Sequence, residues 1–173
     1  TPLGDFRAEE NYTNFGLTAA AESVARAAGT DWATLSERDL YAPLGMTSTS
    51  SRFADFMARG NRATSHVPID GQWKVTTLQR QPDAQSPAGG VSSSASDMAF
   101  WMKLVLGNGT VDGREVIPAD ALTPAITAQF VSKPSSSAAA RSGLSGYGFN
   151  VGVTPSGLPM LSHSGAFALG IAC

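Results

Sequence analysis

The chain has 173 residues, enough for about one domain, and its 42% hydrophobic residues can supply a buried core. A net charge of −2 excludes the strongly basic surface that binds nucleic acid, and the longest unbroken apolar run, Met98–Met102, is far shorter than the ~20 residues of a membrane span. With one cysteine, Cys173, the chain can form no internal disulfide, and the compartment stays open between cytoplasm and periplasm or secretion.

Two helices are predicted in the N-terminal part of the chain. Asn14 is the expected N-cap of a helix over 15–28, and Gly29 is well placed as the left-handed residue that ends it. Asp31 is the expected cap of a shorter helix from 32 to about 40. Helical structure is therefore expected to dominate the start of the chain.

The next segment, 47–85, shows no clear helical or strand periodicity. Asp70-Gly71 within it is typical of a tight turn. Long segments of this kind are usually functional or mobile, so we expect a loop-rich excursion here.

The clearest helix comes after this excursion. Ser94 and Asp97 have capping-box spacing, which would satisfy two backbone amides at the start of the helix, and Gly107 is its expected end. Four residues at helical spacing give one apolar face: Met98, Trp101, Met102 and Val105. Pro118 suits the first position of a further short helix, which Pro124 interrupts.

Strand periodicity appears only towards the C-terminus. Residues 132–146 are rich in Ser, Ala and Gly and are expected to form a loop or linker. Alternating apolar residues over 147–153 predict a strand, and 154–158 a hairpin loop. Further strands are predicted over 160–164 and 167–172. Helices first and a sheet last indicate an α+β fold, whose sheet has only begun when the chain stops.

No complete catalytic motif stands in the sequence. There is no Gly-x-Ser-x-Gly elbow, no glycine-rich phosphate loop and no His-Glu-x-x-His. The two histidines, His66 and His163, lie far apart in the sequence without paired carboxylates nearby, which argues against a metal site. We therefore expect neither a metal nor a cofactor.

Three local patterns carry more information together than each does alone. Tyr12-Thr13-Asn14 precedes the first helix, the segment 87–99 enters the capped helix, and His163-Ser164-Gly165-Ala166 ends a strand. Each has a purely structural explanation: an N-cap beside a packed tyrosine, a tight turn, and a strand end. Their order and separation, however, resemble the serine β-lactamase and penicillin-binding-protein superfamily, and most closely its class C-related esterases and D-aminopeptidases.

Two further stretches support this resemblance. The segment 40–47 is similar to the family's Pro-Leu-Gly-Met-x-x-Thr stretch after the second helix. Tyr147-Gly148-Phe149 resembles the Tyr-Gly-x-Gly-Trp strand ahead of the third motif, although Asn150 replaces the second glycine and no tryptophan follows. The resemblance covers essentially the whole chain and implies a β-lactamase/transpeptidase-like fold.

The resemblance implies roles for the first pattern. In the family, the tyrosine of the Tyr-x-Asn loop helps to deprotonate the nucleophile or to protonate the leaving group, and this role would fall to Tyr12. The asparagine, here Asn14, would bond a substrate amide or carbonyl.

The resemblance also implies roles for the third pattern, which corresponds to the family's Lys-Thr-Gly or His-x-Gly motif on the strand that lines the active site. His163 would be catalytic and Ser164 would contact substrate. Gly165 would let the substrate approach the strand backbone closely. The backbone amide of Ala166 would be one oxyanion-hole donor. Phe167 either lines the acyl pocket or packs in the fold.

The family's nucleophile motif, Ser-x-x-Lys, is missing. No serine stands three residues before any of the three lysines, which are Lys74, Lys103 and Lys133. In the family this motif lies N-terminal to Tyr-x-Asn, and only eleven residues precede Tyr12. We therefore expect the chain to be an internal fragment of a longer protein or one chain of a complex.

The resemblance implies a serine hydrolase that attacks an ester, amide or β-lactam carbonyl of a small molecule through an acyl-enzyme. Residues 1–140 would form mainly the helical-domain portion and 141–173 the start of the antiparallel sheet. The nucleophile would come from a missing N-terminal segment or a companion chain, and this chain alone would be inactive. The alternative is a non-catalytic, ligand-binding homologue of the same fold.

Overall fold

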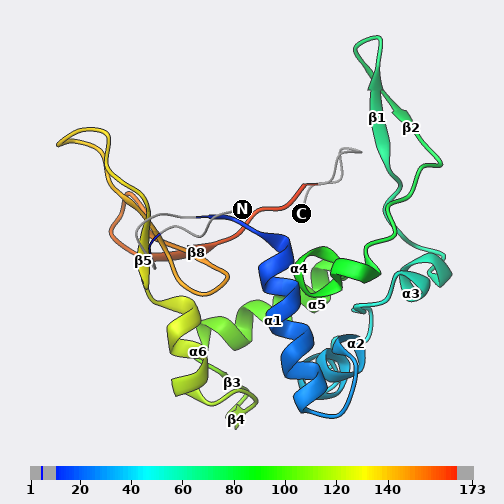
Figure 1. Ribbon diagram of the computed structural model, residues 1–173, viewed down its shortest axis with the longest axis horizontal. Coiled ribbons are helices and arrows are strands. Elements are labelled where there is room, and N and C mark those ends of the chain that lie inside the picture. The colour runs from blue at the N-terminus through cyan, green and yellow to red at the C-terminus, as the bar shows by residue number, and fades with distance from the viewer. Residues whose placement is uncertain (1–4, 6–10, 167–173) are drawn as a thin grey trace. The chain divides into compact units, whose positions relative to one another are not determined.

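The computed structural model describes residue 5 and residues 11–166 (Figure 1). The chain forms two compact units. Over the described residues, the first unit comprises residues 5, 11–12 and 102–163, and the second comprises residues 13–101 and 164–166.

The first helix of the second unit, α1 (Asn14–Ala27), begins one residue earlier than predicted. Its N-cap is Thr13, whose extended backbone lets the side-chain oxygen accept a hydrogen bond from the amide of Gly16 at 3.3 Å. The prediction that Asn14 caps the helix is therefore wrong: Asn14 is the first helical residue. Gly29, with φ +71°, follows the helix in the left-handed conformation that the sequence predicts.

The second predicted helix is confirmed, with a change of winding in its second half. Helix α2 (Trp32–Ser36) passes directly into a π-helical turn, Glu37–Tyr41. Asp31 is its N-cap, as predicted, and its carboxylate accepts hydrogen bonds from the Thr34 amide at 3.0 Å and the Thr34 hydroxyl at 2.7 Å.

A β-hairpin stands within the segment that was expected to be loop-rich (Figure 1). Strands β1 (His66–Ile69) and β2 (Gln72–Val75) pair antiparallel, joined by Asp70-Gly71. Both turn residues have positive φ, +52° and +73°, which matches the twist of a tight hairpin and confirms the predicted turn. The two strands were missed because most of their side chains are exposed, so no buried face imposes an alternating pattern.

Short helical elements flank this hairpin. Helix α3 (Phe53–Ala58) precedes it. A 3₁₀ turn, Asp83–Gln85, follows the hairpin and leads into α4 (Ser86–Gly89), which packs against α1. The buried apolar side chains of this unit are few: Ala25, Tyr41, Leu44 and Met46.

Helix α5 (Ala95–Leu106) supplies residues to both units and begins as predicted. The amide of Asp97 donates to Ser94 Oγ at 3.1 Å, which is half of the expected capping box. The Asp97 carboxylate is used elsewhere, as shown below. The apolar face is only partly buried: Leu104 and Val105 are buried, whereas two of the four predicted face residues, Met98 and Met102, are exposed.

The first unit continues with a hairpin of β3 (Thr110–Val111) and β4 (Arg114–Glu115), followed by α6 (Ala119–Ile126). Pro118 is the N-cap of α6 and not its first helical residue. Pro124 lies inside the helix without ending it, which corrects the predicted interruption. The helix has only eight residues, so the proline removes few backbone hydrogen bonds.

Four antiparallel strands in the order β5-β6-β7-β8 form the sheet of the first unit. They are β5 (Phe130–Lys133), β6 (Gly143–Ser145), β7 (Asn150–Val153) and β8 (Pro159–Ser162). The predicted loop over 132–146 is therefore wrong at both ends. The strand residues within this segment, 132–133 and 143–145, form short runs rich in glycine and serine. A register shift between Val131 and Lys133 interrupts the pairing of β5 with β6, which hides the alternation.

The end of the sheet agrees better with prediction. The hairpin loop 154–158 is confirmed, because Val153 pairs with Pro159 across it. Tyr147-Gly148-Phe149 forms a turn instead of the predicted strand, closed by the Gly146 amide donating to the Phe149 carbonyl at 2.9 Å. The strand predicted over 167–172 lies outside the described residues.

In the described part of the chain, no helix combines the length and apolar character that crossing a bilayer requires.

The cap of α2 predicts a pH dependence of stability. Hydrogen bonds from the Thr34 hydroxyl and amide, together with the Arg52 guanidinium, lower the pKa of Asp31 from 3.8 to about 2. The ionised carboxylate therefore stabilises the folded chain above about pH 4, and this contribution is lost as the pH falls towards 2. Urea unfolding of wild type and Asp31→Ala between pH 2 and 6 should show a stability difference that shrinks with acidification. A constant difference would contradict this, and Asp120→Ala, an exposed carboxylate in the first turn of α6, is the control.

Candidate active site

In the first pattern, Tyr12-Thr13-Asn14, the side chains of Tyr12 and Asn14 make no contact on which the fold depends. Tyr12 is 71% exposed, so it is not the packed tyrosine of the structural explanation. Asn14 is exposed as well, and Thr13 supplies the helix cap in its place. Within the described residues, no hydrogen bond involves either side chain. Tyr12 and Asn14, which directly precede and follow the capping residue Thr13 in the sequence, are therefore available to bind a ligand.

The third pattern directly follows strand β8, which ends at Ser162. His163, Ser164, Gly165 and Ala166 are all exposed. A Cβ atom placed on Gly165 would meet no atom of the described residues within 4 Å, so among these residues the space beside its backbone is open. This opening is what close approach of a substrate to the main chain requires. Phe167, the other residue predicted here, lies outside the described residues.

The second pattern, residues 87–99, covers the end of α4, a loop over 90–94 and the start of α5. This loop is bound to a segment more than forty positions earlier in the chain. Ser50 and Ser92 exchange two backbone hydrogen bonds of 2.9 Å each. Gly90 packs so closely on Ser86 that a Cβ atom would lie 2.5 Å from the Ser86 Cα. The Pro-Leu-Gly-Met-x-x-Thr stretch and the loop that enters α5, both singled out in the sequence, thus belong to one structural feature.

A buried carboxylate holds these two segments together. Asp97 is 5% exposed, and its Oδ2 accepts hydrogen bonds from the Ser48 amide and from Thr49 Oγ1, each at 2.7 Å. Because the single proton of the Thr49 hydroxyl goes to the carboxylate, Ser93 Oγ is the donor in its 2.8 Å bond with Thr49 Oγ1. The charge of Asp97 therefore orders both the start of α5 and the preceding loop.

A second buried network lies under the same loop and involves no charge. Ser51 Oγ bonds the Tyr41 hydroxyl at 2.8 Å and Ser36 Oγ at 3.0 Å. Ser86 Oγ donates to the Ser51 carbonyl at 2.6 Å. All four side chains are buried, so these bonds satisfy groups that would otherwise be desolvated without a partner.

The serines of this loop form hydrogen bonds that hold the loop in place. Ser92 Oγ donates to the Ser50 carbonyl, and Ser94 Oγ accepts from the Asp97 amide. His66, the histidine of this unit among the described residues, has its Nδ1 at 2.8 Å from the Thr64 carbonyl. Among the described residues, no hydrogen bond pairs a serine with a histidine, so they form no Ser–His catalytic pair.

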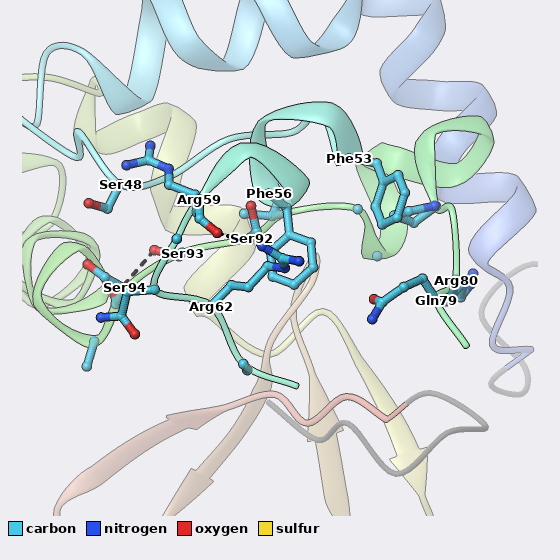
Figure 2. Close-up of a pocket in the computed structure, with 18 residues that line it drawn as sticks. Ser48, Phe53, Phe56, Arg59, Arg62, Gln79, Arg80, Ser92, Ser93 and Ser94 are labelled. Atoms are coloured by element: carbon cyan, nitrogen blue, oxygen red, sulfur yellow. Dashed lines mark hydrogen bonds between the residues drawn. The ribbon is translucent and has the colours of Figure 1, made fainter. Parts of the chain in front are cut away.

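A cavity of about 640 Å³ lies in the second unit, bordered by this loop (Figure 2). Its lining includes Ser92–Ser94, the aromatic residues Phe53 and Phe56, and the cationic residues Arg59, Arg62 and Arg80. Sequence reasoning missed it because its aromatic and cationic residues fall in the segment 47–85, where periodicity is poor. A usable signal was the run between Asp55 and Asp70, which contains two arginines and no acidic residue.

In the part of the chain that the structure describes, no group of three His, Cys, Asp or Glu side chains could hold a metal ion.

A family model described as Beta-lactamase matches residues 1–172. A search of curated protein sequences finds no match. Among solved structures, an octameric penicillin-binding protein homologue from Pyrococcus abyssi superposes with a TM-score of 0.71 and 18% identity, covering 90% of this chain and 33% of that chain. A D-stereospecific amidohydrolase from Streptomyces sp. gives a TM-score of 0.71 and 17% identity, covering 92% and 44%.

A beta-lactamase/D-alanine carboxypeptidase from Yersinia pestis also superposes, with a TM-score of 0.60 and 19% identity over 93% of this chain and 44% of that chain. Likeness at this level of identity shows the fold. The mixed helices and antiparallel strands are those of the β-lactamase/transpeptidase-like fold, with part of its sheet. The chain spans less than half the length of each of these three structures.

The Asp97 network predicts a large loss of stability on truncation. Asp97→Ala removes the acceptor of two hydrogen bonds and leaves the Ser48 amide and the Thr49 hydroxyl without it, so the free energy of unfolding should fall by about 2–4 kcal/mol. Urea unfolding measures this change. Glu115→Ala, at an exposed position of β4, should change it by less than about 0.5 kcal/mol. Equal effects of the two substitutions would contradict the assigned role of Asp97.

Proposed function

The chain belongs to the beta-lactamase family, and on that basis we propose that it forms part of a serine hydrolase acting on an ester, amide or β-lactam carbonyl. The observation that carries this proposal is that Tyr12 and Asn14 are exposed and are not needed by the fold. A motif side chain that makes no contact needed by the fold is expected to contact a ligand.

In the proposed reaction, the Oγ of a serine attacks the carbonyl carbon of the substrate and forms a tetrahedral intermediate. Tyr12 and a lysine share the serine proton and pass it to the leaving group. A phenol accepts a proton efficiently when a cation beside it stabilises the phenolate, and the lysine of a Ser-x-x-Lys motif supplies that cation. Water then hydrolyses the acyl-serine and releases the acid.

In this proposal, residues 163–166, which follow β8, stabilise the tetrahedral intermediate and bind the substrate. The backbone amide of Ala166 donates to the oxyanion of the tetrahedral intermediate, and loss of one such donor costs roughly a hundred- to a thousandfold in rate. The open space beside Gly165 admits the substrate to the backbone. His163, Ser164 and Asn14 would bond the substrate around it.

The nucleophile and its lysine are proposed to lie outside these 173 residues, on a preceding segment or a companion chain, because no Ser-x-x-Lys is present. By itself the chain should then be inactive, since removing the nucleophile abolishes nearly all of the rate that such an enzyme provides. Absence of the motif also favours one other candidate, a ligand-binding homologue without catalysis.

Intact-mass spectrometry of native material before and after treatment with a fluorophosphonate separates these candidates. We expect one adduct on a species heavier than 17.9 kDa, or on a second chain that copurifies with this one. Absence of an adduct from every species would support the ligand-binding homologue. An adduct on a lone 17.9 kDa species would show that the nucleophile lies within this chain and would refute its proposed location. Heat-denatured protein is the control for nonspecific labelling.

Gly165→Ala tests the proposed role of the open backbone. The added methyl group has no neighbour within 4 Å among the described residues, and Gly165 needs no positive φ, so the melting temperature should be unchanged. Hydrolysis of p-nitrophenyl acetate by the complete enzyme should lose at least about tenfold in kcat/KM, because the methyl group occupies the substrate's path. Gly152→Ala in β7, whose added atom would lie 3.6 Å from Met160 Cε, is the matched control and should retain activity. Full activity of Gly165→Ala would argue against substrate contact here.

A further inference from the structure

The cavity beside the serine loop carries a concentration of positive charge that the proposed reaction does not use. Among the described residues of its lining, three are arginines and none is an aspartate or glutamate. The whole chain carries a net charge of −2, so the local excess of positive charge is opposite in sign to the net charge. In Figure 2, Arg59 and Arg62 lie at the same end as Ser92–Ser94, while Arg80 lies at the opposite end.

Two of these guanidinium groups are held in place by backbone carbonyls. Arg59 Nη2 donates to the Thr47 carbonyl at 2.9 Å. Arg62 Nη1 donates to the carbonyls of Met57 at 3.2 Å and Arg59 at 2.7 Å. A guanidinium has five N–H donors, so each side chain keeps donors beyond these bonds. Within the described residues, neither Arg59 nor Arg62 forms a salt bridge.

The acidic side chains closest in sequence to the lining are already engaged with donors outside the cavity lining or with the backbone. Asp97 accepts from Ser48 and Thr49, as described above. Asp83 accepts from the Phe53 amide at 2.8 Å, and Asp55 accepts from Ser50 Oγ at 2.6 Å. Arg59 and Arg62 are exposed, and their positive charge is left without a carboxylate partner in the described part of the chain. A guanidinium group binds carboxylates and phosphates through paired hydrogen bonds.

Part of the lining is apolar. Phe53 and Phe56 have ring centroids 6.2 Å apart and planes tilted by 30°, and Pro82 and Val91 extend this surface. A volume of about 640 Å³ is in the range of sites for small organic molecules. The cavity therefore offers fixed donors for an anionic group and an apolar wall for the body that carries it.

We propose that this cavity binds a small organic anion, in which a carboxylate or phosphate group joined to an aromatic or other apolar group pairs with Arg59 and Arg62 while the apolar group packs on Phe53 and Phe56. The Arg62 guanidinium is the principal anchor, because two backbone carbonyls fix its position. Binding needs no nucleophile, so it is independent of the hydrolase proposal and can be measured without turnover.

Isothermal titration calorimetry of the purified protein with phenylacetate and with phenyl phosphate tests this site, and the two probes identify the preferred anionic group. We expect saturable binding of at least one probe, weakened by at least about tenfold in Arg62→Gln. Phenylacetamide, which keeps the ring but has no charge, should bind at least about tenfold more weakly than phenylacetate if the carboxylate is preferred. Inorganic phosphate should bind more weakly than phenyl phosphate, because it lacks the apolar part.

Arg26→Gln is the matched control, because Arg26 is an exposed arginine in the last turn of α1 and does not line the cavity. Arg62→Gln loses bonds to the backbone as well as its charge, so its thermal melt is compared with that of wild type, and Arg59→Gln provides an independent variant. In the wild-type protein, amide chemical shifts of residues 60–63 and 89–95 should move on titration. Equal loss of affinity in Arg26→Gln, tight binding of phenylacetamide, or shifts confined to other residues would overturn the proposal.

Discussion

The buried carboxylate of Asp97 is the constraint on which the second unit depends. It joins the Ser48 amide and the Thr49 hydroxyl to the first turn of α5, and through Thr49 it also positions Ser93. A charge-assisted hydrogen bond that is shielded from water is stronger than a neutral one, and a buried charge without such partners would be unfavourable. The loop that borders the cavity therefore has one arrangement in which this charge is satisfied.

Polar contacts also replace apolar packing elsewhere in this unit. Ser36, Ser51 and Ser86 are buried together with the Tyr41 hydroxyl, and each finds a hydrogen-bond partner among the others or in the backbone. Networks of this type specify a unique geometry, because a shifted segment leaves a buried group unsatisfied. They suit a region that must present Ser92–Ser94 and the cavity in a fixed shape, whereas an interior of interchangeable apolar side chains would tolerate several packings.

The sequence predicted the elements whose signals are local. Asp31 caps α2, Gly29 ends α1, and the turn at Asp70-Gly71 appears where its residues require it. The strands β5 and β6 could not be predicted, because β6 has only three residues and a register shift between Val131 and Lys133 interrupts the pairing of the two strands. For α5, periodicity identified an apolar face. It could not show that Leu104 is the most buried apolar residue of the helix, because burial depends on packing.

The candidate site shows the same division. The motif residues could be named from their order along the chain, and the structure adds that Thr13, not Asn14, is the cap. The hydrogen bond between Asp97 and Thr49 was not predictable. The capping-box spacing already assigned the Asp97 carboxylate to a backbone amide at the start of its own helix, and the carboxylate does not make that bond. The cavity arginines were missed for a related reason: their importance comes from lining the same cavity, which a sequence without periodicity does not reveal.

The cap of α1 also constrains how the segment beside Tyr12 and Asn14 can change during evolution. A Cβ atom at Gly16 would lie 2.9 Å from the Thr13 methyl carbon, and this side chain is already fixed by its bond to the Gly16 amide. Alanine at position 16 would otherwise be favoured, by roughly 1 kcal/mol of helix propensity. Serine at position 13 keeps the capping oxygen but lacks that methyl group. The two positions are therefore epistatic: Thr13→Ser opens the route to Gly16→Ala, and the reverse order passes through a strained intermediate.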